Sequence, residues 1–109
     1  MSDQLGAFEQ AVLLAILRLG DEAYGRAILQ EVQVRLKRDV PAGAVHSTLE
    51  RLERKSLIAS RRGSGTPVRG GRARRFYRLL PSAFRALTGA RAAIDALWHG
   101  ITWPLNGSA

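Results

Sequence analysis

The chain has 109 residues, no cysteine and a formal net charge of +8 at pH 7. A chain of this length forms one domain with a modest core, so self-association would add to its stability. The missing cysteines exclude disulfides and cysteine-ligated metal sites, and the positive charge favours a polyanion such as nucleic acid or an acidic membrane surface.

The start of the chain and its apolar runs predict a cytoplasmic protein. Ser2, Asp3 and Gln4 lack the positive charge that opens a signal peptide. The apolar residues 11–17 are far fewer than the ~20 that cross a bilayer. We therefore expect no membrane partner.

The first predicted helix covers residues 5–19. Its apolar side chains recur at helical spacing over a wide face: Leu5, Phe8, Val12, Leu13, Leu14, Ile16, Leu17 and Leu19. Such a helix is expected to be buried on two sides, one against its own domain and one against a partner. Gly20 and Asp21 predict a glycine C-cap and a turn at its end.

A short connection, residues 22–25, leads into a second predicted helix that ends near Arg38. Its core face comprises Ile28, Leu29, Val32 and Leu36. Gly25 near the helix start leaves two interpretations open. The glycine lets a phosphate approach the backbone N–H groups there, or it serves only the turn.

The third predicted helix begins at Pro41, which suits a first helical position because proline has no N–H to leave unpaired. Its apolar face comprises Val45, Leu49 and Leu52, with Leu57 and Ile58 at the exit. Its opposite face is small, polar and partly basic and comprises Gly43, Ser47, Glu50, Arg51 and Arg54, with His46 on the flank. Two helices joined by a short turn, the second amphipathic, predict a helix-turn-helix.

A basic hairpin is predicted next, with strands at residues 58–62 and 74–79 and a glycine- and arginine-rich tip at residues 63–71. Nine basic residues and no acidic residue lie between Arg54 and Arg78, whereas the rest of the chain is nearly neutral. This favours a nucleic-acid footprint over a solvated loop in an arginine-rich chain. The expected fold is mainly α-helical with a small β-hairpin, a winged helix whose third helix enters the DNA major groove.

The last predicted helix starts with Pro81 as its first residue or Ser82 as its cap. Apolar residues then recur at spacings of three and four: Leu87, Ala90, Ile94, Leu97 and Ile101, with Trp98 beside them. We interpret this seam as a dimer interface rather than a contact within the domain. The expected organisation is a winged helix-turn-helix over residues 1–80 and a dimerisation helix with a loose tail over residues 81–109.

Three segments resemble the PadR family of bacterial transcriptional regulators, in the short form with one C-terminal helix. They are Ala23-Tyr24-Gly25 with the helix after it, residues 43–58 and residues 70–79. The resemblance covers residues 5–101 and implies a homodimer that binds a pseudo-palindromic operator, usually as a repressor. It also implies that some members release DNA when a small aromatic or hydrophobic molecule binds near the dimer interface. This chain departs from the family at His46, where a tyrosine close to DNA is usual, and after the second strand, where Leu80-Pro81 and Ser82-Ala83 replace threonine and glycine.

The residues expected to contact DNA lie at the start of the second helix, on the outer face of the third helix and in the hairpin: Tyr24, Gly25, Gly43, His46, Ser47, Arg51, Arg54, Arg69, Arg72, Arg74 and Arg75. Small residues let the helix settle into the groove, and arginines reach phosphates or a guanine. His46 has the alternative of half-buried packing. Arg51 and Arg54 have the alternative of pairing with neighbouring glutamates.

Trp98 is the candidate contact for a small aromatic or hydrophobic effector, with ordinary interface packing as the alternative. No cofactor, metal site or enzymatic activity is expected. His46 and His99 lie far apart, and the glycine-rich segment leads into a strand rather than a helix. Two alternatives to a DNA-binding regulator stay open: a basic RNA-binding or ribosome-associated module, and a winged helix that binds only proteins.

Overall fold

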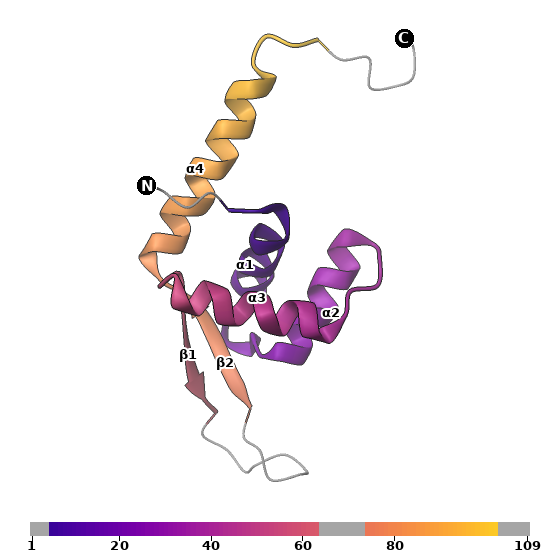
Figure 1. Ribbon diagram of the computed structural model, residues 1–109, viewed down its shortest axis with the longest axis vertical. Coiled ribbons are helices and arrows are strands. Elements are labelled where there is room, and N and C mark those ends of the chain that lie inside the picture. The colour runs from indigo at the N-terminus through magenta and orange to yellow at the C-terminus, as the bar shows by residue number, and fades with distance from the viewer. Residues whose placement is uncertain (1–4, 64–73, 103–109) are drawn as a thin grey trace.

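The computed structural model describes residues 5–63 and 74–102. In chain order its elements are α1 (Ala7–Leu19), the short 3-10 helix η1 (Gly20–Glu22), α2 (Gly25–Leu36), α3 (Ala42–Arg54), β1 (Ile58–Arg62), β2 (Arg75–Leu79) and α4 (Pro81–Trp98). The first three α-helices form the body, from which the hairpin and α4 leave in opposite directions (Figure 1). This confirms the predicted winged helix.

The core consists of the apolar faces of α1, α2 and α3 together with the start of β1. Its largest fully buried side chains are Val12, Leu13, Ile16, Ile28, Val32, Leu52 and Ile58. Those in the helices are positions that helical spacing predicted, and Ile58 is the apolar residue expected at the exit of the third helix. Burying a side chain of this size contributes about 1.5–3 kcal/mol. Because α1 contacts α2, α3 and β2, it lies at the centre of this core.

One side of α1 stays open. Leu14 and Leu17 are 47% and 49% exposed, although Leu13 and Ile16 beside them are buried. The wide apolar face of this helix therefore packs on the core with one side and leaves the other side to solvent in the single chain.

The helix starts differ in detail from the sequence prediction. α1 begins at Ala7 rather than Leu5, because the Glu9 carboxylate accepts a hydrogen bond from the Gly6 N–H at 3.0 Å and caps the helix. Pro41 is the N-cap of α3 and not its first residue, since its φ of -66° and ψ of 141° are those of extended backbone. Pro81 is at the start of α4, as one of the two predicted alternatives required.

β1 and β2 pair antiparallel, from Ile58 opposite Leu79 to Arg62 opposite Arg75. The chain before α2 runs alongside them, because the Tyr77 N–H donates to the Ala23 carbonyl at 2.9 Å. We call the β1–β2 hairpin the wing. These contacts fix its base next to the start of α2. Within the described ranges, no helix has both the length and the apolar character that crossing a membrane requires.

Candidate nucleic-acid interface

The outer face of α3 is open to solvent and carries small and polar side chains. Gly43, His46, Ser47 and Arg54 are all exposed there. A Cβ added at Gly43 would meet no heavy atom within 4 Å. A helix with such a face can approach the floor of a major groove closely, as the sequence predicted.

His46 lies on this outer face and not against the core. Its side chain is 71% exposed, and its Nε2 lies 3.4 Å from Oε2 of Glu50, one helical turn further on. Glu50 therefore faces His46 rather than Arg54, with which the sequence suggested a pair. The exposed imidazole is in a position to reach a phosphate or a base edge in either protonation state.

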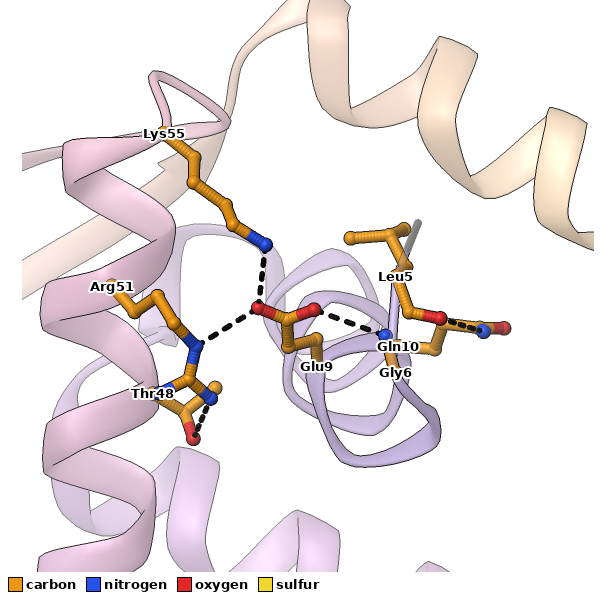
Figure 2. Close-up of polar contacts among 7 residues, drawn as sticks. All are labelled: Leu5, Gly6, Glu9, Gln10, Thr48, Arg51 and Lys55. Carbon is orange, nitrogen blue, oxygen red and sulfur yellow. Dashed lines mark hydrogen bonds and ion pairs between the residues drawn. The ribbon is translucent and has the colours of Figure 1, made fainter. Parts of the chain in front are cut away.

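Arg51 lies on a different side of α3, which corrects its assignment to the outer face. Its Nε donates to Oε2 of Glu9 at 3.0 Å, and its Nη2 donates to Thr48 Oγ1 at 3.3 Å (Figure 2). Lys55 donates to the same Glu9 oxygen at 3.0 Å. Both cations reach from α3 toward α1, so Arg51 joins the two helices, and 43% of its side chain stays exposed.

Glu9 is the acidic centre of this contact and is only 6% exposed. Burial raises the pKa of its carboxyl, but the hydrogen bonds from Gly6, Lys55 and Arg51 outweigh that effect and hold the pKa below its ordinary value. Glu9 is not among the residues predicted from the sequence. The available signal was its position four residues after Leu5 and three before Val12, which places a carboxylate on the buried stripe of α1.

The wing adds arginines at the edge of this interface. Arg62 and Arg75 are exposed and stand opposite each other in the hairpin register, an arrangement that is repulsive unless an anion lies nearby. Arg75 also donates to Ser60 at 3.0 Å, and Ser60 in turn donates to Glu53 of α3 at 2.8 Å. The wing is thus tied to α3. The predicted contacts Arg69 and Arg72 lie outside the described residues.

Tyr24 and Gly25 lie where the wing meets the start of α2. The guanidinium carbon of Arg74 stands 4.2 Å from the centre of the Tyr24 ring, so this ring faces a wing arginine. Gly25 is exposed, and a Cβ added to it would meet nothing within 4 Å. The backbone at the start of α2 is therefore open to an approaching phosphate.

A groove of about 550 Å³ lies between α2, α3 and β2, beside the outer face of α3. Its polar lining residues are hydrogen-bond donors or amides and include no carboxylate: Arg26, Gln30, Gln33, His46 and Tyr77. Burial raises the pKa of the Tyr77 hydroxyl above its ordinary value, and a tyrosine O–H can donate to an anion. Sequence analysis assigned no function to Arg26, Gln30 or Tyr77, because only the packed elements bring them around one groove that suits an anion.

The residues predicted for the dimer interface lie along α4. Ile94, Leu97 and Trp98 are 52%, 71% and 53% exposed. Leu87 and Ala90, nearer the body, are partly covered. The free end of α4 therefore presents an apolar stripe to solvent.

Ile101 does not continue the helical seam as expected. α4 ends at Trp98, and the chain turns at Gly100, where φ is 81°. Ile101 is 57% exposed beyond this turn.

Within the part of the chain that the structure describes, no cluster of three or more histidine and acidic side chains is arranged to hold a metal ion.

Comparison with protein families matches the chain to the "Transcriptional regulator PadR-like family" over residues 13–86. The chain belongs to this family. The match runs from within α1 to the first part of α4 and so contains α2, α3 and the β1–β2 hairpin. PadR-like proteins are DNA-binding transcriptional regulators, and this chain is accordingly a regulator rather than an enzyme.

Solved structures of other proteins, among them two PadR-family regulators, have the same fold. The regulator from Eggerthella lenta is 26% identical with a TM-score of 0.63, and the alignment covers 90% of this chain and 82% of that one. The regulator from Clostridium difficile is also 26% identical, with a TM-score of 0.62 and coverage of 84% and 95%. BpsR from Bordetella bronchiseptica, whose DNA binding is regulated by 6-hydroxynicotinic acid, is 20% identical with a TM-score of 0.60 and coverage of 96% and 74%. No curated protein matches the chain.

Proposed function

We propose that this PadR-like regulator is a homodimeric repressor that binds a pseudo-palindromic operator. The observation that carries the proposal is an exposed surface around the groove that α2, α3 and β2 line, with the outer face of α3 and the base of the wing beside it. We call this surface the DNA face. Its middle has no side chain at Gly43, and its edge carries the cations Arg62 and Arg75. That distribution suits a helix in the major groove with phosphates on either side.

Base readout is assigned to the exposed side chains of α3. His46 and Ser47 are in a position to donate to or accept from base edges, and Glu50 can accept from cytosine N4. Arg54 suits a phosphate or a bidentate contact to guanine. Arg51 is left out of the base-reading set, because its Nε is already bonded to Glu9.

Phosphate contacts are assigned to the groove and the wing. Arg26 and the Gly25 backbone would contact phosphates of one DNA strand. The wing arginines would contact phosphates of the other DNA strand. Two copies of this arrangement give six to ten phosphate contacts, which imply a loss of roughly 10³–10⁵ in affinity between 50 and 200 mM salt. Binding of this kind is steeply salt-dependent but carries little sequence information by itself.

A second copy of the chain is the proposed occupant of the exposed apolar surface. Leu14 and Leu17 on α1, with Ile94 and Leu97 on α4, are each about half exposed or more. Covering them removes apolar surface from water, which drives association. Trp98 stays the proposed contact for a small aromatic effector, and the aromatic acid that regulates BpsR is an example within the same fold.

Selection from a pool of random duplexes tests the proposal. The expected product is an inverted repeat with half-site centres one helical turn apart, about 10 bp, or a multiple of that. His46→Ala and Glu50→Gln should change the selected bases, whereas the matched surface change Arg78→Gln should leave them unchanged. An unenriched pool, with equal binding to single-stranded RNA, would favour the RNA-binding alternative.

A further inference from the structure

Two guanidinium groups and two aromatic rings alternate at the base of the wing. The Arg74 guanidinium carbon lies 4.2 Å from the centre of the Tyr24 ring. Tyr24 meets Phe76 edge to face, with ring centres 5.6 Å apart and planes at 66°. The Arg61 guanidinium carbon lies 4.8 Å from the centre of the Phe76 ring. Both cations are within the ~6 Å at which a ring face attracts a cation. We call these four residues the wing-base stack.

The backbone fixes the two rings of the stack. Tyr24 is the N-cap of α2, and its extended backbone forms an isolated β-bridge with Phe76. The next residue, Tyr77, donates its N–H to the Ala23 carbonyl at 2.9 Å. The Phe76 ring of the wing is therefore fixed against the Tyr24 ring at the start of α2, and each ring carries an arginine of the wing on its face.

Gly63 is the small residue that lets the stack close. A Cβ added there would lie 2.9 Å from Cε1 of Phe76 and 3.4 Å from the Arg74 carbonyl oxygen. The Gly63 N–H donates to that same carbonyl at 2.7 Å. The hydrogen bond from Gly63 thus holds the backbone of Arg74, and the Tyr24 ring holds its guanidinium.

We infer that Tyr24 and Phe76 are positioning residues, which hold Arg74 and Arg61 in the orientation that binds DNA phosphates. Stacking uses the flat face of a guanidinium and leaves its N–H edge free for a phosphate. An arginine that is already ordered loses less conformational freedom when it binds. This inference rests on the proposed DNA binding, and it replaces a direct DNA contact by the Tyr24 hydroxyl with an effect transmitted through Arg74.

The stack is tested first in the free protein by NMR of the arginine side-chain Nε–H groups. Ring currents should displace the Arg74 signal in the wild type and in Tyr24→Phe, and Tyr24→Leu should abolish the displacement. Arg78, exposed on the same strand, provides the control signal, which should not move in any variant. An Arg74 signal that is the same in the wild type and Tyr24→Leu would overturn the inference.

Binding to a selected operator duplex supplies the second test. Tyr24→Phe should bind like the wild type, because the ring is kept. Tyr24→Leu should bind roughly tenfold to a hundredfold more weakly, as expected for loss of one cation–π contact in each protomer of the proposed dimer. Its salt slope should fall by about 1.8, the value of two phosphate contacts, one in each protomer of the proposed dimer. Partial unfolding would lower the apparent affinity without changing that slope.

A double-mutant cycle separates positioning from direct contact. If Tyr24 acts through Arg74, the double variant Tyr24→Leu/Arg74→Ala should bind no more weakly than Arg74→Ala alone. Additive losses, or a loss in Tyr24→Phe equal to that in Tyr24→Leu, would overturn the inference while leaving the proposed function intact. Failure of the wild type to bind any duplex would overturn the proposed function, and the positioning role with it. Should Tyr24→Leu not fold, Arg74→Lys keeps the charge without the planar group and should lose affinity, and full affinity in Arg74→Lys would overturn the inference.

Discussion

Nε of Arg51 lies 3.0 Å from Oε2 of Glu9, and this pair joins the proposed base-reading helix α3 to the central helix α1. Lys55 reaches the same oxygen from the end of α3. The orientation of the DNA face therefore depends on a carboxylate that lies outside it. α1 also carries the exposed Leu14 and Leu17 on its other side, so the helix connects the proposed dimer contact with the proposed DNA contact.

Replacing Glu9 with glutamine should destabilise the fold. The change removes the negative charge that Arg51 and Lys55 share. An amide has one acceptor oxygen where the carboxylate has two, so either these cations or the Gly6 N–H would face an NH₂ group. Hydrogen bonds to charged groups are worth about 1.5–3 kcal/mol, so the free energy of unfolding should fall by about that amount. Urea denaturation measures it, with the exposed Glu50→Gln as the control, which should change stability by less than about 0.5 kcal/mol. Equal stability of the two variants would contradict the structural role of Glu9.

The same carboxylate predicts how stability depends on pH. Its folded-state pKa lies below the ordinary value of 4.5, so the folded protein binds its proton less readily than the unfolded chain. The stabilisation is therefore fully present above pH 4.5 and is lost as pH falls through the folded pKa. Acid titrations of unfolding free energy should be steeper for the wild type than for Glu9→Gln. Parallel titrations would show that Glu9 does not carry this acid sensitivity.

Replacing Gly43 with leucine should separate DNA binding from folding. The new side chain enters open space in the free protein, and leucine is a better helix former than glycine by about 1 kcal/mol at most. Thermal stability should be unchanged or slightly higher. Affinity for the operator should fall by more than about tenfold, because the side chain fills the space between α3 and the groove floor. Gly43→Ala is the graded control and should lose much less. Full affinity in the leucine variant would show that DNA binds a surface other than the outer face of α3.

Charge on the free end of α4 should split the dimer. Leu97 is 71% exposed in the single chain, so Leu97→Lys leaves the protomer folded but buries a charge in the proposed interface. Sedimentation should then give a monomer, with Asp95→Asn as a control on the same exposed turn that stays dimeric. A dimer that persisted even when Ile94 was also changed to lysine would move the interface to another surface.

Much of the fold follows from local patterns, whereas part of the site depends on packing. Helical spacing predicted the buried residues, such as Leu13 and Leu52, because one turn of helix fixes which side chains share a face. The same reasoning misplaced Arg51, since the helix alone gives no sign that Glu9, 42 residues earlier, lies opposite it. Tyr24 was predicted at the interface, but its pairing with Arg74 exists only once the hairpin packs beside α2. Ile101 fitted the spacing of the α4 seam, yet the helix stops before it at Trp98.

Fluorescence anisotropy over a salt series tests the central claim of a sequence-specific regulator most directly. The duplex from immediately upstream of the protein's own gene would be compared with a scrambled duplex of equal length. We predict at least ~10³-fold tighter binding to the native duplex at physiological salt, with a steep loss of affinity as salt rises. Equal and weak binding to the native, scrambled and selected duplexes would contradict the claim and identify a nonspecific basic module instead.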